Sequence, residues 1–426
     1  MAVYGPVTNW RRVPTTLSAV CRSNRSKCKY QGNFSSTMPQ EKFTVEHAFS
    51  QSSVKKSNGN GMLRDFRSVV IFGGAGFIGS NFAHYLLRET KAKVHVFDNL
   101  SRPGSRQNLE WLQEAAKDSG RLKITIGDIR NYTLVERAVR HATEIYHFAA
   151  QVAVTTSIDD PRTDFDVNAG GTLNILEAAR KGGHRPFILY TSTNKVYGAL
   201  TGQPLVAYQR SYRLAPQDLI TEAQPLNFHS PYGCSKGAAD QYVRDYARIY
   251  GLPTVVFRMS CIAGTRQFGT EDQGWVAHFI YSALQKDPVT IYGDGRQTRD
   301  VLWVADLIEA MNAVRENLPQ AAGEVFNVGG GCGNTTSLLE LMDSIEVLTG
   351  RKMEHTFANS RPGDQMFYVT NHEKLTRMTG WKPATALPEV IRQIARWWKS
   401  NQELFGLVHA ESQEFAPSLE AVQEPA

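Results

Sequence analysis

Tyr232 and Lys236 have residue types and a spacing that suit proton transfer. A phenol titrates at about pH 10, so it needs a neighbouring cation to act as a base at neutral pH. Residues four apart share one face of a helix, which places an ammonium at position 236 beside the phenol at position 232. We therefore expect a phenol of lowered pKa that removes the proton of a hydroxyl group.

A glycine-rich turn much earlier in the chain indicates the partner for this chemistry. Gly73, Gly76 and Gly79 close the apolar run 68–72 and open an expected helix. Glycines at a strand end let the backbone approach a pyrophosphate closely, and the helix N-terminus offers it free N–H groups. The turn and the tyrosine–lysine pair together predict a nucleotide-dependent redox enzyme.

A carboxylate at the end of the second expected strand selects between dinucleotides. This strand, 93–97, is followed by Asp98, 22 residues after Gly76. At this place a carboxylate accepts both ribose hydroxyl hydrogens and repels a 2′-phosphate, so NAD is the expected cofactor. Arg102 leaves NADP as the alternative, because a nearby guanidinium accommodates the additional phosphate.

Strands and helices then alternate, with further strands expected at 122–126, 144–148 and 187–190. Because the carboxyl ends of parallel strands border one crevice, Asp128 and Ile129 are expected near the adenine and residues 149–152 along the cofactor. The predicted fold is α/β, a Rossmann-type doubly wound parallel sheet with a smaller C-terminal α/β substrate domain. We assign the NAD-binding domain to 67–261, with 320–330 returning to it, and the substrate-binding domain to 262–401.

Composition excludes two classes of partner. Apolar residues make up 42% and charged residues 21% of the chain, and no apolar run is long enough to span a bilayer, so no membrane association is expected. The net charge of +6 resides in the first 66 residues, which hold ten Lys and Arg against three acidic residues, so nucleic acid is not expected either. The five cysteines lack metal-ligand spacing, which predicts no metal site and a cytoplasmic location.

The two ends of the chain are expected to lie outside the folded part. Residues 1–66 have the composition of a disordered basic extension, for which translation from too early a start is favoured over an organellar transit peptide. Residues 402–426 are polar and rich in glutamate, and we expect a flexible tail there.

From about residue 67 to 400 the chain resembles the extended short-chain dehydrogenase/reductase family of nucleotide-sugar epimerases and dehydratases. Besides the features above, the resemblance rests on Asn168 in 166–172, Thr193 ahead of 196–198, Arg299 in 299–301, and the strings 326–329 and 381–383. Longer strings at 97–102, 108–112, 151–159, 192–198 and 228–242 are similar to the branch that acts on CDP-linked sugars. Met259 and Cys261 depart from that branch, in which His and Ser are typical at the nicotinamide end.

The resemblance also implies the contacts of both ligands. Expected NAD contacts are Gly73, Gly76, Phe77, Ile78, Gly79, Asp98, Asn99, Ser101, Arg102, Asp128, Ile129, Ala149, Ala150, Gln151, Asn168, Tyr232 and Lys236. Expected contacts of a nucleotide-diphosphate sugar are Gln151, Thr193, Arg266, Gln267, Gln273, Tyr292, Arg299 and Arg361. Arg299 and Arg361 are the diphosphate candidates, because a guanidinium pairs with two phosphate oxygens at once.

Two larger features follow from the same resemblance. The insertion at 199–230 is expected over the cleft. The helices at about 170–182 and 234–250 are expected to form a homodimer or a higher homo-oligomer, although packing within one chain would give the same apolar pattern.

The catalytic residues implied are Thr193, Tyr232 and Lys236, with the threonine hydroxyl holding the substrate oxygen. A 4,6-dehydratase of this family has an Asp-Glu pair after the threonine, whereas this chain has Asn194 and Lys195, which are poor acid and base catalysts. The resemblance therefore implies an isomerase that oxidises and re-reduces one carbon, C2, of a CDP-linked sugar. A UDP-sugar 4-epimerase and a nucleotide-sugar reductase remain alternatives. The presence of both Tyr232 and Lys236 argues against a non-enzymatic NAD-sensing regulator.

Overall fold

The computed structural model describes residues 67–200, 204–214 and 219–414. The expected basic extension and the last part of the expected tail lie outside these residues. Among the described helices none is long and apolar enough to cross a membrane.

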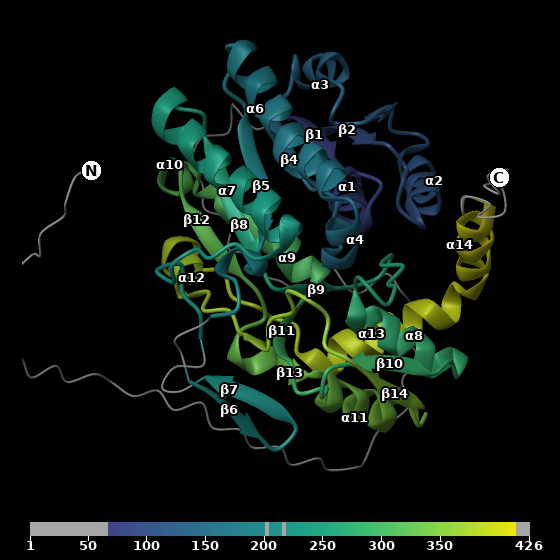
Figure 1. The fold of residues 1–426 in the computed structure, drawn as a ribbon. Helices are drawn as coiled ribbons and strands as arrows, with labels where there is room; N and C mark the ends of the chain where they lie inside the picture. Colours follow the sequence, from purple (N-terminus) through teal and green to yellow (C-terminus); the bar gives the residue numbers. More distant parts are fainter. Residues whose placement is uncertain (1–66, 201–203, 215–218, 415–426) are drawn as a thin grey trace, which may run out of the picture. The chain divides into compact units, whose positions relative to one another are not determined.

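A seven-stranded sheet with the strand order β12-β8-β5-β4-β1-β2-β3 forms the centre of the part predicted to bind the nucleotide (Figure 1). All of its neighbouring strands are parallel. The strands are β1 (Ser68–Phe72), β2 (Lys93–Asp98), β3 (Leu122–Ile126), β4 (Glu144–His147), β5 (Phe187–Thr193), β8 (Thr254–Met259) and β12 (Val325–Val328). The chain reverses its direction across the sheet between β1 and β4, which is where such sheets form a ligand crevice. The predicted α/β fold class is confirmed.

Helices cover both faces of this sheet and bury its central strands, whereas the edge strand β3 stays partly exposed. One apolar cluster joins the sheet to α1 (Phe77–Glu89), α2 (Ser105–Ala116) and α9 (Val304–Glu316). A second cluster joins the opposite face to α3 (Tyr132–Val139), α6 (Gly171–Lys181) and α7 (Ser230–Tyr250). Burial on both faces explains why strands such as β1 are continuous apolar runs rather than alternating ones.

The part predicted to bind the substrate contains smaller sheets and its own core. Strand β11 (Thr298–Trp303) pairs with β9 (Cys261–Ala263), β13 (Thr335–Ser337) and β15 (Phe367–Tyr368), and β10 (Val289–Tyr292) pairs with β14 (His355–Ala358). The core lies between these strands and α8 (Trp275–Gln285), α11 (Leu338–Thr349) and α13 (Leu387–Ser400). The remaining described helices are α4 (Val154–Asp159), α5 (Pro161–Phe165), α10 (Leu318–Ala321) and α12 (Glu373–Thr379).

The segment that returns to the large sheet is longer than the predicted 320–330. Leu307, Met311 and Val314 of α9 are fully buried in the core shared with β1, α1 and α2. An apolar helix face must be covered, and here the large sheet covers it. The second half of the chain therefore contributes α9 as well as β12 to the nucleotide-binding part.

The predicted flexible tail is wrong for residues 402–414, which form α14 (Gln402–Glu414). The ring of Phe405 lies 5.6 Å from Trp397, 4.7 Å from Tyr281 and 5.3 Å from Phe268, measured between centroids. One aromatic side chain in a polar segment thus supplies the packing that holds the helix.

The described residues of the 199–230 insertion are not among those that line the large cavity, and its expected place over the cleft stays a prediction. Strands β6 (Leu205–Tyr208) and β7 (Ser211–Leu214) form an antiparallel hairpin at the bottom of Figure 1. Tyr212 donates its backbone N–H to Arg296 and its hydroxyl to Asp294 at 2.7 Å. These contacts fasten the hairpin to the loop before β11, whose Gln297 lines the large cavity, while no residue of the hairpin itself lines it.

Candidate active site

One cavity of about 800 Å³ receives the carboxyl ends of the central strands. Every predicted cofactor and substrate residue except Asn168 lines it. The sequence therefore identified the walls of this cavity, although the contacts within it differ from several expectations.

The glycine turn between β1 and α1 is tightly folded and lets a ligand approach the protein backbone. Gly73 has a φ of +77°, and a Cβ there would lie 2.6 Å from the backbone nitrogen of Ala149. A Cβ on Gly79 would lie 2.1 Å from the carbonyl oxygen of Gly73. A Cβ on Gly76 would meet only that same oxygen, at 3.3 Å, so this glycine keeps the cavity side open.

Asp98 ends β2 with its carboxylate fixed by the backbone. Its oxygens accept hydrogen bonds from the N–H groups of Ala75 at 2.9 Å and Leu100 at 2.8 Å. Burial raises the pKa of Asp98, and these backbone hydrogen bonds oppose the rise. The carboxylate is thus tied to the glycine turn at the place expected for the ribose.

A polar network extends from Asp98 to the expected adenine end. Asn99 donates to Asp128 at 3.2 Å, and Arg130 pairs with the same carboxylate at 2.9 Å. Burial works against ionisation of Asp128, but hydrogen bonds from Arg130 outweigh it and lower the pKa of Asp128. Arg130 was not predicted, although its place two residues after Asp128 in the same strand-end loop was a usable signal.

Arg102 and Gln273 connect the two parts of the chain across the cavity. The guanidinium of Arg102 donates to the side-chain oxygen of Gln273. Burial lowers the pKa of Arg102, and the charge of Asp272 opposes this shift. Gln273, predicted to contact the substrate, therefore meets the loop that follows β2.

Asn168 lies behind the cavity wall. Its side chain accepts from the backbone N–H of Gln151 at 3.0 Å, donates to the carbonyl of Gln151 at 3.1 Å, and donates to Ser235 at 3.1 Å. The residue belongs to a π-helical turn, Asp166–Gly170, that interrupts the regular helix. Asn168 thus fixes the backbone of Gln151, which does line the cavity, in place of the predicted direct contact with the cofactor.

Tyr232 and Thr193 come together from α7 and the end of β5. Burial raises the pKa of Tyr232 to about 12, while a hydrogen bond with Thr193 opposes the rise. The expected lowering of this pKa is therefore wrong for the ligand-free site. Desolvation of the phenolate exceeds any stabilisation by neighbouring cations here.

Lys236 occupies the next turn of α7 and also lines the cavity. Its ammonium donates to the carbonyl oxygen of Thr191 at 2.7 Å and lies 4.3 Å above the ring centroid of Tyr190. Burial lowers the pKa of Lys236 to about 7, while Asp240 and Asp164 oppose the shift. A close carbonyl and a partly lost charge explain why this residue does not acidify the phenol.

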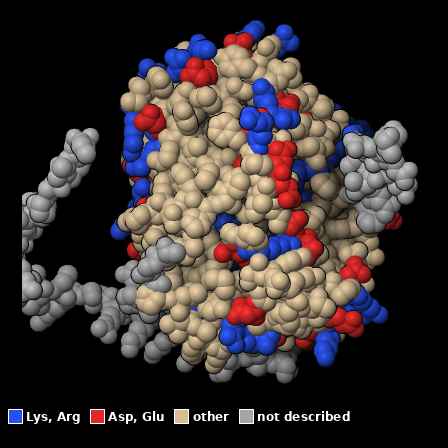
Figure 2. Space-filling model, in the orientation of Figure 1, with Lys and Arg blue, Asp and Glu red and all other residues tan. Residues whose placement is uncertain are grey.

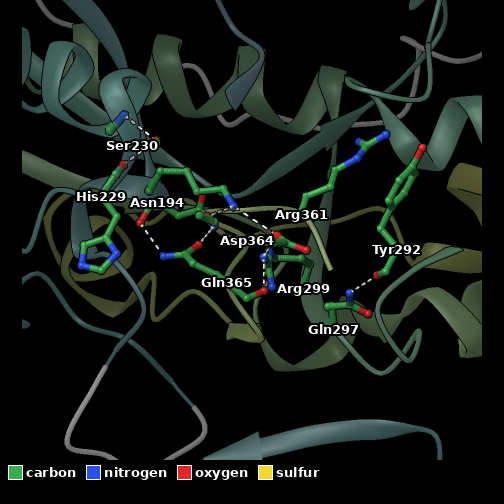
Figure 3. Close-up of polar contacts among 12 residues, drawn as sticks. Asn194, His229, Ser230, Tyr292, Gln297, Arg299, Arg361, Asp364 and Gln365 are labelled. Carbon is green, nitrogen blue, oxygen red and sulfur yellow. Dashed lines mark hydrogen bonds and ion pairs between the residues drawn. The ribbon is translucent and has the colours of Figure 1, made fainter. Parts of the chain in front are cut away.

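The two residues after Thr193 are engaged with the segment 363–365 (Figure 3). Asn194 donates to the side chain of Gln365 at 3.1 Å, and Lys195 pairs with Asp364 at 3.3 Å. Arg299 pairs with Asp364 from the other side at 3.4 Å. Burial disfavours the charge on Asp364, but Lys195 and Arg299 outweigh this effect and lower its pKa.

Arg361 lies across the ring of Tyr292 (Figure 3), with its guanidinium carbon 3.7 Å from the ring centroid. The same guanidinium pairs with Asp272 at 3.1 Å and with Glu271 at 3.5 Å. Arg361, which is expected to bind the diphosphate, thus has acidic partners here. The ring of Tyr292 also orients the planar face of its guanidinium.

Met259 and Cys261 both line the cavity. The Cys261 sulfur accepts from the indole N–H of Trp275 at 3.2 Å. Burial raises the pKa of the Cys261 thiol, while Arg299 opposes the rise. The departure from the family pattern therefore places a protonated thiol and a thioether in the site.

Sequence reasoning missed Asp364, Lys195 as its partner, and Trp275. The first two were accessible in principle, because Asp364 follows the predicted Arg361 within the same short loop and Lys195 follows Thr193. Their pairing was not, since it joins positions 169 residues apart.

Comparisons with known proteins agree with this geometry. Residues 70–394 match the family described as GDP-mannose 4,6 dehydratase. The chain is 42% identical over 340 residues to CDP-paratose 2-epimerase of Salmonella typhi, which covers 78% of this chain and 99% of that protein.

Two solved structures are also similar. One is UDP-glucuronic acid 4-epimerase of Bacillus cereus in complex with UDP-glucuronic acid and NAD, with a TM-score of 0.68, 26% identity, and coverage of 78% of this chain and 99% of that one. The other is dTDP-glucose 4,6-dehydratase of Streptomyces venezuelae with NAD bound, with a TM-score of 0.70, 28% identity, and coverage of 80% and 99%.

Proposed function

Because this chain belongs to the extended short-chain dehydrogenase/reductase family of NAD-dependent nucleotide-sugar epimerases and dehydratases, we propose that it inverts C2 of CDP-paratose to give CDP-tyvelose. The observation that carries this proposal is the side-chain set around Thr193. Tyr232 and Thr193 are placed for oxidation of an alcohol, while Asn194 and Lys195 stand where a dehydratase needs an acid and a base.

The residues present fit NAD. The turn at Gly73, Gly76 and Gly79 leaves backbone N–H groups of α1 open to a diphosphate, and Asp98 is fixed at the ribose position. Asn99 and Asp128 continue the polar wall toward the adenine end. When bound in its oxidised form, NAD supplies a hydride acceptor with a positively charged ring.

Tyr232 and Thr193 would perform the proton chemistry. The Thr193 hydroxyl holds the reacting sugar oxygen, and Tyr232 takes the hydroxyl proton as the carbon loses hydride. A positive charge beside the phenol lowers its pKa, so Tyr232 becomes a better base in the loaded site than in the ligand-free one. The sugar ketone then rotates so that the hydride returns to its opposite face, and Tyr232 gives the proton back to the sugar oxygen.

This site lacks a suitable general acid and general base for elimination of water. Asn194 has no titratable group, and the ammonium of Lys195 is held between Asp364 and the carbonyl of Gly363. Asp364 is itself paired with two cations, so it is kept ionised, carries no proton to donate, and is a weak base. A transient oxidation followed by re-reduction at the same carbon remains, and that is epimerisation.

The substrate assignment rests on similarity and on the arginines. Arg299 and Arg361 line the cavity and are our candidates for the nucleotide diphosphate, and the cytidine base and C2 position come from the relative at 42% identity. A UDP-sugar 4-epimerase would use the same catalytic residues.

We further propose a homodimer through α7, the helix expected at about 234–250, with α4 and α5 in place of the expected helix at about 170–182, because α6 exposes no large apolar side chain. Tyr242, Ile249 and Phe165 are exposed there, and the face over α7 is largely without charged side chains in the space-filling view (Figure 2).

The test is to incubate the purified protein with CDP-paratose, without added NADH, and to follow inversion at C2 by NMR. The proposal predicts CDP-tyvelose without net formation of NADH. Accumulation of NADH, or a requirement for added reductant, would identify a reductase instead. Thermal denaturation with CDP, UDP and GDP tests the base separately, because a ligand that binds only the native state raises the melting temperature. Equal shifts for all three would overturn the cytidine assignment.

A further inference from the structure

Arg266 is a cationic residue of the cavity wall without an acidic partner among residues 67–200, 204–214 and 219–414. Its guanidinium carbon lies 4.4 Å from the ring centroid of Trp111 and 5.9 Å from that of Trp397. Burial lowers the pKa of Arg266 to about 10, and no carboxylate opposes this shift. A partly desolvated cation without a counter-charge costs free energy, which an incoming anion would offset.

The position of Arg266 places it in the cofactor half of the cavity. Its carbonyl accepts from the side chain of Asn108 at 3.4 Å, and the same Asn108 amide donates to Ala75 of the glycine turn at 3.2 Å. Trp111 belongs to α2 and is stacked on His84 of α1 at 4.1 Å. The Asn108 contacts hold the backbone of Arg266 beside the glycine turn that precedes α1, where the fold directs the diphosphate of a dinucleotide.

The other cavity arginines differ from Arg266 in their partners. Arg102 donates to Gln273 and Arg130 pairs with Asp128, while Arg299 pairs with Asp364 and Arg361 pairs with Asp272 and Glu271. The guanidinium carbon of Arg266 lies near two indole rings, and no acceptor among the described residues takes a hydrogen bond from its N–H groups. The N–H groups of a guanidinium match two phosphate oxygens at once.

We propose that Arg266 binds the diphosphate of NAD, with Trp111 and Trp397 as positioning residues that hold its guanidinium plane. This assignment replaces the sequence-based expectation that Arg266 contacts the sugar nucleotide, and it rests on the proposed function only for the identity of the cofactor. It also gives the C-terminal helices a role in cofactor binding, because Trp397 belongs to α13 and is packed against Phe405 of α14.

Binding of ligand fragments to the full chain tests the assignment. Arg266→Met keeps the stem that packs on the indoles and removes the charge. We expect the dissociation constants of NAD and ADP-ribose, measured by calorimetry, to rise about 10- to 100-fold, as for a lost charge-assisted contact. The dissociation constants of adenosine, which lacks phosphate, and of CDP should change less than about two-fold, which is the size of effect expected from a substitution at a remote site.

Arg361→Met is the matched control, because it removes a cavity arginine from the substrate half. It should weaken CDP and leave ADP-ribose unchanged. Equal weakening of adenosine and ADP-ribose by Arg266→Met would show a merely structural role. Weakening of CDP alone would return Arg266 to the substrate. Either result overturns the proposal.

Arg266→Lys keeps a charge without the planar fork and covers the case in which the methionine variant does not fold. It should still weaken ADP-ribose more than adenosine, and equal effects on the two would again contradict the proposal. Because these measurements use no sugar, they remain valid even if the protein does not epimerise CDP-paratose.

Discussion

The ammonium of Lys236 donates its hydrogen bond to the carbonyl oxygen of Thr191, at 2.7 Å. Tyr232, four residues earlier on the same helix face, instead shares a hydrogen bond with Thr193. The lysine is therefore anchored to the end of β5, while the phenol meets the last residue of that strand. Both residues line the cavity, and burial opposes the ionised form of each.

Binding of oxidised NAD should lower the pKa of Tyr232. Burial alone raises the pKa of this phenol to about 12, and a pyridinium beside it favours the phenolate. The measurement is the difference in phenolate absorbance between the wild-type protein and Tyr232→Phe over a pH titration, with and without NAD. A new titration step below pH about 10, the ordinary tyrosine value, is expected only with NAD.

The Tyr232→Phe variant serves as the reference because it should fold and bind NAD normally. Its turnover should fall by about 10²- to 10⁴-fold, the usual effect of removing a general acid–base group. Near-normal turnover would assign the proton role to another residue.

Lys236 should make the NAD-free protein less stable as the pH falls from about 10 to about 7. Burial lowers its pKa to about 7 in the folded state, whereas the unfolded chain keeps the ordinary value of about 10.4. Between these values the unfolded state binds more protons, so the free energy of unfolding rises with pH, by at most about 1.4 kcal/mol per pH unit. Below pH about 7 both states are protonated and the penalty is constant.

Urea denaturation of the wild type and Lys236→Met at several pH values isolates this effect. The stability of the wild type relative to the variant should increase from pH 7 to pH 10. The dependence of this stability difference on pH is informative, because loss of the hydrogen bond to Thr191 changes the free energy of unfolding of the variant equally at every pH. A flat difference would show that Lys236 keeps its ordinary pKa.

Most of the fold was predictable because its signals are local. The apolar runs that became β1 and β2, the turn at Gly73 and the carboxylate at Asp98 each follow from neighbours in sequence. Helix α14 was missed because its stability comes from Phe405 meeting Trp397, Tyr281 and Phe268. Tertiary packing of one ring outweighs a polar composition, and the segment 402–414 alone does not show the partners.

The candidate site was predictable in its residues but not in their pairing. The strand ends predicted which side chains border the cavity, because the carboxyl ends of parallel strands lie at the same edge of the sheet. The carbonyl of Thr191 that holds Lys236, and the pairing of Arg361 with Asp272, join segments that are far apart in sequence. The pKa of Tyr232 was predicted with the wrong sign because spacing on a helix gives proximity and not the extent of burial.

The ion pair between Asp240 and Arg258 should be essential for joining α7 to β8. Both carboxylate oxygens accept from the guanidinium at 2.9 Å, and the side chains are 0% and 4% exposed. Removing one partner leaves an uncompensated buried charge, so Asp240→Leu or Arg258→Met should each cost about 3–5 kcal/mol in urea denaturation. The double variant should lose clearly less than the sum, and additive losses would contradict a coupled pair.

Asp272→Asn should tighten binding of CDP, because it releases Arg361 from an ion pair that the diphosphate must displace. The ion pair is partly exposed, with side chains 24% and 47% accessible, so breaking it costs little, as for other surface ion pairs. The dissociation constant of CDP should therefore fall only about two- to five-fold. Glu389→Gln removes an acid that pairs with Arg392 on α13, outside the cavity wall, and serves as the control. Weaker CDP binding by Asp272→Asn would mean that the carboxylate supports Arg361 rather than competing for it.

Transfer of hydride away from one sugar carbon and back to it is tested most directly with CDP-paratose that carries deuterium at C2. The reaction is run in ordinary water with the protein as purified, and the product is analysed by NMR and mass spectrometry. We predict CDP-tyvelose that keeps its deuterium at C2 with the configuration inverted. Inversion with replacement of the deuterium by solvent hydrogen would contradict the account, because the carbon would then have lost a proton rather than a hydride.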